Sequence, residues 1–429
     1  MTTHGHGPHH DDHDHHHHDH HHHDHGHGHR HRTPSRRALL AGASGLLVLS
    51  SAPGTASAAG TRTARSSDVP AQRIGAARTS RLTQGTTLVH ADMHNHTAMS
   101  DGDGDPELAF ASLRDAGLDV AALTDHATLL GIEGISDEEW DRTGRLADAA
   151  DDPGAYTAIR GFEWSHPLQG HANIWFTDDW VDLGGADGPD SLYSWLRDRD
   201  AVASFNHPGR EPGMFDSFSF SAGVLEKMVG LEMFNRGDDY LFDGWSDTGR
   251  SPLVACLNAG WRTGLTGVTD EHGTDWGFPE GKGRSGLWVA ENTRAGVFEA
   301  MRARRFFATR VSGLRLDAIA GGVRMGGTLG QSSGDVRFTV DLDRGPEWEG
   351  KPLNIQVLRP GSDAPAVADV IETQSNKVTE FTVPLDAADG DWIVLRISDP
   401  SQANPSPGPS GHPCNDWGVA YSSPWWLQA

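Results

Sequence analysis

Histidine and aspartate are concentrated in the segment HADMHNHTAMSDG at residues 90–102, which follows the short apolar run at 87–89. His94 and His96 stand two positions apart, so on an extended segment both imidazoles point the same way and can chelate one cation. The glycines of the next stretch, SDGDGD, predict a sharp turn that brings Asp101 back toward the two histidines. Imidazole and carboxylate ligands without thiolate are typical of zinc, manganese or iron sites, so this segment indicates metal-dependent chemistry.

The same pairing of an apolar run with a terminal histidine or carboxylate recurs along the chain. Of the nine histidines beyond residue 32, six belong to such clusters. A single histidine of this kind is usually a hydrogen-bonded residue near a loop, but six of them joined by acidic residues are hard to explain by packing. We therefore predict a multinuclear metal centre. Its predicted ligands are His94, His96, Asp101, His126, Glu163, His171, His207, Asp270 and His272.

Two further aspartates stand directly beside this set. Asp92 precedes His94 by two positions, and Asp125 immediately precedes His126. Histidines that bind metals usually donate their second ring N–H to a carboxylate or carbonyl, so we interpret Asp92 and Asp125 as residues that orient a ligand histidine.

The polar clusters need a framework that brings them to one place. From about residue 87 to residue 310, short apolar runs alternate with amphipathic segments, and the segments 106–118, 190–200 and 292–308 are predicted helices. Repeated strand-then-helix order predicts a parallel sheet or a barrel. The carboxyl ends of the strands of a parallel barrel form one face, so side chains that close successive strands meet there.

The pattern of apolar and polar residues changes at about residue 311. Residues 311–429 contain runs of alternating apolar and polar residues that are separated by Gly, Pro, Asp and Asn at short intervals. This pattern predicts an antiparallel all-β sandwich domain. The tryptophan pair Trp425–Trp426 near its end is interpreted as packing against a neighbouring domain, and a ligand-binding surface is the alternative.

The segments before residue 87 are interpreted as processing and connecting segments. Residues 1–32 are a His-rich tail with 17 of the 26 histidines, which is either a cation reservoir or a solvated tail without a role. Residues 33–58 combine Arg36–Arg37 with a short apolar stretch and a small-residue end, which is typical of a twin-arginine (Tat) signal peptide; a Sec signal is the alternative. Residues 59–86 are interpreted as a linker. We therefore expect the Tat export machinery to be a partner and the mature protein to be secreted and extracellular.

Charge and cysteine content limit the other classes of function. A formal net charge of −24 argues against binding to nucleic acid or to an anionic membrane surface. The apolar stretch of the signal is too short and rich in glycine for stable membrane insertion. Cys256 and Cys414 are the only cysteines, which excludes a disulfide scaffold and a zinc finger. Cys256 is predicted to be a buried thiol, and a bridge to Cys414 is the alternative.

The ordered motifs DMHNHTAMSDG, LTDH, GFEWS, GHAN, NHPG and GVTDEHG resemble those of the PHP (polymerase and histidinol phosphatase) superfamily of metal-dependent phosphoesterases. The resemblance covers residues 87–310. The following ENTRAGVFEAMRARRFFATR and the terminal AYSSPWW resemble the branch that includes carbaryl hydrolase-like proteins. This resemblance implies an α/β chain in which a distorted seven-stranded (β/α) barrel at 87–310 precedes the β sandwich.

The resemblance also implies two or three divalent cations. It implies a first ion held by His94, His96, Glu163 and Asp270, a second by Glu163, His171 and His207, and a third by Asp101, His126 and His272. Many members of the family have a histidine where Asp101 stands. His166 is a rival for the place of His171, and the motif GHAN favours His171.

These residues predict a secreted metal-dependent phosphoesterase that hydrolyses phosphate monoesters or diesters of small or lipid-derived compounds. Metal-bound water supplies hydroxide as the nucleophile, and a further ion polarises the phosphoryl oxygen. Arg210 and Arg236 are predicted to bind the phosphate, with ordinary surface arginines as the alternative. The alternative functions are a metal-dependent carbamate or aryl ester hydrolase and a non-catalytic extracellular metal-binding protein.

Overall fold

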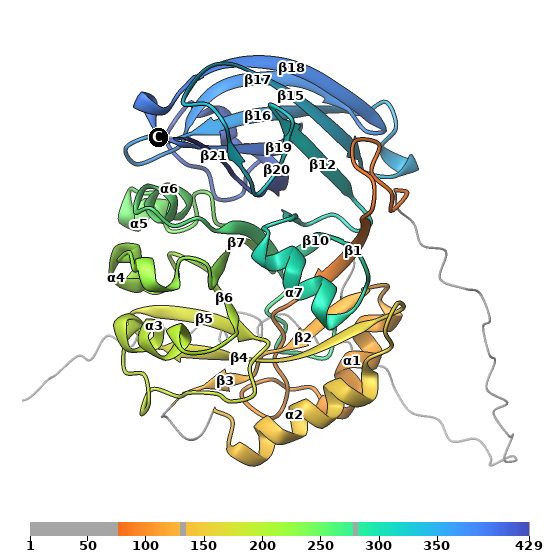
Figure 1. Cartoon of the computed structure of the whole chain (residues 1–429), viewed down its shortest axis with the longest axis vertical. Helices are drawn as coiled ribbons and strands as arrows, with labels where there is room; N and C mark the ends of the chain where they lie inside the picture. The colour runs from red at the N-terminus through yellow and green to blue at the C-terminus, as the bar shows by residue number, and fades with distance from the viewer. Residues whose placement is uncertain (1–75, 129–133, 278–281, 429) are drawn as a thin grey trace, which may run out of the picture. The chain divides into compact units, whose positions relative to one another are not determined.

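The computed structural model describes residues 76–128, 134–277 and 282–428, and Figure 1 shows how this part of the chain runs. The predicted tail at 1–32, the predicted signal peptide at 33–58 and most of the predicted linker lie outside the described residues. Helices and strands alternate through the first part, and strands dominate the second. The predicted mixed α/β class is confirmed.

One large sheet runs through the first part of the described chain. Its strands are β1 (Thr87–Asp92), β2 (Val120–Leu123), β3 (His126–Ala127), β4 (Thr157–His166), β5 (Gly170–Trp175), β6 (Val202–Phe205), β7 (Met228–Asn235), β8 (Asp238–Asp239) and β9 (Gly264–Val268). Parallel pairs join β1 to β2, β2 and β3 to β4, β6 to β7, and β7 to β9. Strand β5 is antiparallel to β4 and to β6, because residues 167–169 alone connect it to β4 and a parallel crossover needs a dozen or more.

The predicted seven-stranded (β/α) barrel is not confirmed, because the sheet does not close within the described residues. Strand β10 (Arg284–Val289) pairs antiparallel along β1, from Thr87 opposite Val289 to Ala91 opposite Ser285. It thereby occupies the edge of β1 that β9 would need for closure. In the part of the chain that the structure describes, the segments after β1 and β9 meet at an isolated bridge between Asn95 and Glu271, without a ladder of their own.

The helices begin near the predicted positions but end earlier. The structure contains α1 (Pro106–Asp115), α2 (Asp137–Ala150), α3 (Pro189–Arg197), α4 (Met214–Phe218), α5 (Trp245–Thr248), α6 (Pro252–Asn258) and α7 (Arg294–Arg302). Asp105 caps α1 by accepting a hydrogen bond from the backbone N–H of Glu107, and Pro106 opens the first turn. The predicted helix at 292–308 ends at Arg302, because its last residues form β11 (Phe306–Thr309), which pairs antiparallel with β10.

The second part of the chain consists of mostly antiparallel strands in two sheets, and β14 and β21 form a parallel pair. Its strands are β12 (Arg315–Ala320), β13 (Val323–Arg324), β14 (Thr328–Leu329), β15 (Ser333–Asp343), β16 (Pro352–Arg359), β17 (Ala366–Gln374), β18 (Lys377–Asp386), β19 (Trp392–Ala403), β20 (Asp416–Ser422) and β21 (Trp425–Leu427). One sheet has the order β13-β12-β15-β18, and the other runs β17-β16-β19-β20. Inward side chains such as Phe338, Val340, Ile355 and Leu395 form a buried core, which is the arrangement of a sandwich.

The sandwich shares a sheet with the first part of the chain. Strand β20 pairs antiparallel with β11, with Phe307 opposite Ser422 and Thr309 opposite Ala420. In Figure 1 the blue strands β19 and β20 lie next to the green and teal elements of the first part. Trp426 belongs to an apolar cluster that also contains Leu253, so the expectation that the terminal tryptophans pack rather than project is confirmed.

A buried polar network reinforces this junction. The guanidinium of Arg396 donates to the Tyr421 hydroxyl at 2.9 Å, to Gln356 Oε1 at 2.7 Å and to Asp416 Oδ1 at 2.5 Å. The Tyr421 hydroxyl in turn donates to Asp239 Oδ1 at 2.7 Å, and Asp239 belongs to the first part of the chain. Burial lowers the pKa of Arg396, but the Tyr421, Asp239 and Asp416 side chains raise it well above its ordinary value, so the guanidinium stays charged.

Both cysteines are free, buried thiols, and the structure does not contain the alternative bridge between Cys256 and Cys414. Burial raises the pKa of the Cys414 thiol to about 12, so it stays protonated at neutral pH. Among the described residues, no helix combines the length and the apolar character needed to span a membrane.

The first prediction concerns the Arg396 network. We expect Arg396→Leu to lower the free energy of unfolding by about 3–5 kcal/mol, because it leaves buried carboxylates without their cation. The control is Arg337→Leu, which removes an exposed ion pair with Glu380 and should cost less than about 1 kcal/mol. Urea denaturation of both variants measures the difference, and equal losses would contradict the structural role of Arg396.

Candidate metal centre

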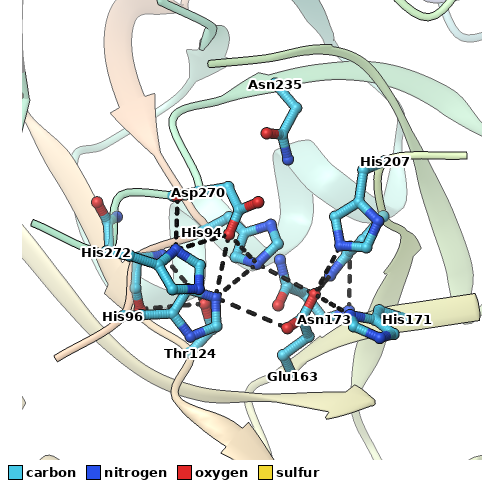
Figure 2. Close-up of polar contacts among 12 residues, drawn as sticks. His94, His96, Thr124, Glu163, His171, Asn173, His207, Asn235, Asp270 and His272 are labelled. Carbon is cyan, nitrogen blue, oxygen red and sulfur yellow. Dashed lines mark hydrogen bonds and ion pairs between the residues drawn. The ribbon is translucent and has the colours of Figure 1, made fainter. Parts of the chain in front are cut away.

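The predicted ligands come from distant parts of the chain and meet in one cluster. Each lies in a strand of the large sheet or in the segment that follows one, in line with the sequence pattern. Figure 2 shows seven of them turned toward one another. The cluster contains His94, His96 and Asp101 after β1, His126 at the start of β3, Glu163 in β4, His171 in β5, His207 after β6, and Asp270 and His272 after β9.

The first group of donors consists of His94, His96, Glu163 and Asp270. The Nε2 atoms of His94 and His96 lie 3.1 Å apart, and they lie 3.4 Å and 3.2 Å from Asp270 Oδ1. Glu163 Oε1 lies 3.2 Å from His94 Nε2, and Glu163 Oε2 lies 3.6 Å from His96 Nε2. Four ligands in a tetrahedron around zinc, at bonds of about 2.0–2.1 Å, are about 3.4 Å apart. The donor set therefore fits a divalent cation.

The second group joins Glu163 to His171 and His207. Glu163 Oε1 lies 3.3 Å from His171 Nδ1 and 3.2 Å from His207 Nε2. The register of β4 and β5 explains the proximity, because Glu163 lies opposite Asn173 and His171 is two residues away on the same face. Glu163 thus faces both the first and the second group, as a bridging ligand would.

The third group is built on Asp101. Its Oδ1 lies 3.2 Å from His272 Nε2, 3.5 Å from His126 Nε2 and 3.9 Å from His96 Nδ1. Within the described residues, the buried atoms Asp101 Oδ1, His96 Nδ1 and His171 Nδ1 lack a hydrogen-bond partner. Buried polar atoms without partners are costly, so their convergence indicates that cations complete these sites.

Two of the remaining histidines, His166 and His412, have structural roles. His166, the rival of His171, lies at the end of β4, where its Nδ1 accepts hydrogen bonds from the backbone N–H groups of Leu168 and Gln169 at 3.2 Å and 3.0 Å. It thereby shapes the β4–β5 turn, and the structure places His171 in the cluster instead. His412 caps a short 3₁₀ helix by accepting from the N–H of Cys414.

Asp92 and Asp125 hold backbone segments rather than imidazole rings. The carboxylate of Asp92 accepts from the N–H and the hydroxyl of Thr269 and, at 3.4 Å, from the N–H of His94. Asp125 accepts from the N–H and the hydroxyl of Thr97, and at 2.6 Å from Ser100 Oγ. They therefore position the segments that carry the ligands, and the predicted contact with a ligand ring is made by other residues.

Glu232 makes such a ring contact, although it was not among the predicted site residues. Its Oε1 lies 2.8 Å from His94 Nδ1, and its Oε2 accepts from the backbone N–H of His207 at 2.7 Å. A glutamate inside the mainly apolar strand β7 was the sequence signal for it. Glu211, whose donors lie near those of His171 and His207, stands in a loop of glycine and proline that carries no comparable signal.

The charges in the cluster favour cations. Burial lowers the pKa of His94, but the Asp270 and Glu163 carboxylates raise it well above its ordinary value. Burial raises the pKa of Glu163, but His171, His94 and His126 hold it well below its ordinary value. Burial and the neighbouring His126 lower the pKa of His96 to about 3, so this imidazole is neutral, as a metal ligand must be.

The second prediction is that cation binding strengthens with pH. Burial and Arg210 lower the pKa of His207, but hydrogen bonds to Glu163 and Glu211 raise it to about 9. Its imidazole is therefore protonated in the ion-free protein at neutral pH, and a cation must displace that proton. We expect Mn²⁺ affinity to increase between pH 6.5 and pH 9, with proton release. Isothermal titration in buffers of different ionisation enthalpy measures both quantities, and binding without proton release would contradict the prediction.

Comparisons with known proteins show only distant similarity. No family model and no curated protein sequence matches the chain. A two-domain protein from Bacteroides vulgatus that contains a predicted PHP-like metal-dependent phosphoesterase is similar in structure, at 15% identity over 81% of this chain and 98% of that chain, with a TM-score of 0.43.

Two further solved structures are similar over a smaller part of the chain. Histidinol phosphate phosphatase from Lactococcus lactis, in complex with zinc, L-histidinol and phosphate, is 14% identical over 43% of this chain and 86% of that chain, with a TM-score of 0.25. An amidohydrolase from Chromobacterium violaceum with bound sulfate is 14% identical over 43% and 87%, with a TM-score of 0.26. Because these TM-scores lie below 0.5, a functional assignment has to come from the side chains of the site itself.

Proposed function

We propose that this chain is a metal-dependent phosphoesterase that hydrolyses phosphate monoesters or diesters of small or lipid-derived compounds. The observation that carries the proposal is a pair of arginines beside the metal ligand Asp270. Arg210 Nη1 donates to Asp270 Oδ2 at 3.1 Å, and Arg236 Nε donates to the Asp270 carbonyl at 3.0 Å. Their side chains are 38% and 47% exposed, so both guanidinium groups keep N–H donors for an incoming anion.

Two guanidinium groups next to the donor groups suit a phosphate ester better than a neutral ester. Arginine matches phosphate through two parallel charge-assisted hydrogen bonds. A carbamate or aryl ester carries no charge that would require two arginines. A metal-storage protein would not need them either, because cations beside the cation-binding groups weaken binding.

The three donor groups and the two arginines have different roles in the proposed reaction. Divalent zinc, manganese or iron ions held by these groups would supply Lewis acidity and an activated water, which phosphate ester hydrolysis needs. Arg210 and Arg236 would bind the phosphoryl oxygens and stabilise the charge that develops on them. The Tyr240 hydroxyl accepts from Arg210 Nη2 at 3.1 Å, which fixes the orientation of that guanidinium.

Export is a separate part of the proposal. We propose that the Tat machinery exports the chain and that the mature protein works outside the cytoplasmic membrane. This part is supported by the sequence at 33–58, with its Arg36–Arg37 pair and small-residue end.

The third prediction tests the metal centre and the reaction together, on protein that begins at residue 59 and so lacks the histidine tract. We expect Glu163→Ala to lose bound metal and to reduce turnover of p-nitrophenyl phosphate or bis-p-nitrophenyl phosphate by about a hundredfold or more, because Glu163 faces two donor groups. Elemental analysis and kinetics measure these effects. Glu138→Ala, on the exposed first turn of α2, is the matched control and should keep both metal and activity.

Other outcomes of this experiment would choose another function. Hydrolysis of 1-naphthyl carbamate without turnover of either phosphate ester would select the carbamate or aryl ester hydrolase. Tight metal binding without turnover of any of the esters would select the non-catalytic metal-binding protein. No more than one weakly held ion, unchanged in Glu163→Ala, would contradict the assigned ligands.

The fourth prediction isolates the arginine pair. We expect Arg210→Met to lower kcat/KM for the preferred phosphate ester by about 10²–10³-fold, because it removes a charged donor to the transition state. Metal content should stay unchanged, since Arg210 is not a ligand. Steady-state kinetics with elemental analysis checks both points, and wild-type kcat/KM in the variant would remove the main support for a phosphate substrate.

A further inference from the structure

Glu211 is a carboxylate beside the metal centre that neither the sequence pattern nor the three ligand groups explain. Its side chain is only 11% exposed. Glu211 Oε2 lies 3.3 Å from His207 Nδ1, and Oε1 lies 3.9 Å from His171 Nε2.

The two histidines lie between two carboxylates. His207 turns Nε2 toward Glu163 and Nδ1 toward Glu211, and His171 turns Nδ1 toward Glu163 and Nε2 toward Glu211. A neutral imidazole has one N–H and one lone pair. If the lone pair faces Glu163, where the second cation would bind, the N–H faces Glu211.

The segment that carries Glu211 is tied to the hairpin that carries His171. The N–H of Gly213 donates to the carbonyl of Leu168 at 2.8 Å, and the N–H of Phe215 donates to the carbonyl of Gln169. A Cβ atom at Gly213 would come within 2.4 Å of the Leu168 carbonyl oxygen, so only glycine allows this close approach. The hairpin and the Glu211 segment are therefore held as one unit.

The backbone after Gly213 is strained in a way that the packing must maintain. All residues of α4, from Met214 to Phe218, have positive φ angles between 38° and 57°. Left-handed backbone costs about 1–2 kcal/mol per non-glycine residue. The rings of Phe215 and Phe218 hold this turn by packing on Phe205 at centroid distances of 4.7 Å and 5.2 Å. Strain of this kind persists only where the surrounding structure determines it, and here it fixes the segment next to Glu211.

We propose that Glu211 is a positioning residue that orients His207, and with it His171, as ligands of the second cation. The carboxylate, 3.3 Å from Nδ1, would accept the Nδ1–H of His207 and so leave the Nε2 lone pair directed at the donor group around Glu163. Glu232 has the equivalent place beside His94 Nδ1 in the first group. This inference rests on the metal centre of the proposed function.

The test measures cation binding by the full-length chain, in which the histidine tract is common to all variants. The experiment compares four proteins: the wild type, Glu211→Ala, Glu211→Gln and the control Glu138→Ala, which lies on the exposed first turn of α2. Loss of a ligand-orienting carboxylate typically costs 10–100-fold in metal affinity. We expect Glu211→Ala to weaken one class of Mn²⁺ sites by about that factor in isothermal titration and to change the Mn²⁺ paramagnetic resonance spectrum.

The glutamine variant and the metal dependence of activity separate orientation from other roles. Glutamine keeps an acceptor oxygen for the His207 N–H, so Glu211→Gln should retain part of the affinity that Glu211→Ala loses. Activity of both variants should return at saturating Mn²⁺, because Glu211 does not contact the substrate.

Three results would overturn the proposal. If Glu211→Ala bound Mn²⁺ as tightly as the wild type, Glu211 would not position the ligands. The metal centre and the proposed function would be unaffected by that result. Equal loss in Glu211→Gln and Glu211→Ala would mean that the carboxylate binds the cation itself. If the wild-type protein had no more saturable Mn²⁺ sites than a Glu163→Ala variant and no esterase activity, the proposed function would be contradicted together with this inference.

Discussion

Burial of several carboxylates beside imidazoles is the constraint on which the rest of this structure depends. The side chains of Glu163 and Asp270 are 0% and 2% exposed, and a buried carboxylate costs several kcal/mol unless donors or cations compensate it. The fold meets this demand by ending successive strands at one place, where each strand contributes a ring nitrogen or a carboxylate. Because no single element supplies more than a few of these groups, the cluster exists only when the whole sheet is assembled.

The convergence of the predicted ligands in one cluster was largely predictable from the sequence, and the open sheet was not. A ligand that directly follows an apolar run is a local signal, because strand ends in a mostly parallel sheet face the same edge. The pairing of β10 along β1 joins residues about two hundred positions apart, and nothing in either run of sequence specifies it. The antiparallel turn of β5 depends on a three-residue connection at 167–169, whose shortness overrides the strand-then-helix pattern.

The residues that support the site likewise include some that the sequence indicated and others that only the structure reveals. Asp92 and Asp125 were recognised by their position next to histidines, yet their carboxylates accept hydrogen bonds from Thr269 and Thr97 rather than from a ring. Asp125 and His126 are direct neighbours and point to opposite sides on an extended segment, so adjacency in the sequence does not imply contact. Glu232 contacts His94 from a strand 138 residues away, and only the packed structure reveals that contact.

The donor cluster and the sandwich are also linked through one backbone segment. Asp270 receives Arg210, Arg210 donates to the Tyr240 hydroxyl, and the neighbouring Asp239 receives the Tyr421 hydroxyl beside Arg396. The two hydrogen-bonded networks thus meet at the adjacent residues Asp239 and Tyr240 of one backbone segment.

The pairing of β11 with β20 has a consequence for any attempt to shorten the protein. A chain cut after Arg310 would keep every residue of the predicted metal centre, but Phe307, Ala308 and Thr309 would lose their partners Ser422, Tyr421 and Ala420. An interior strand would become an open edge of unpaired N–H and C=O groups, which recruits strands from other molecules. Such a fragment would be prone to edge-to-edge aggregation, and the residues after 310 thus also protect the solubility of the part that carries the donor cluster.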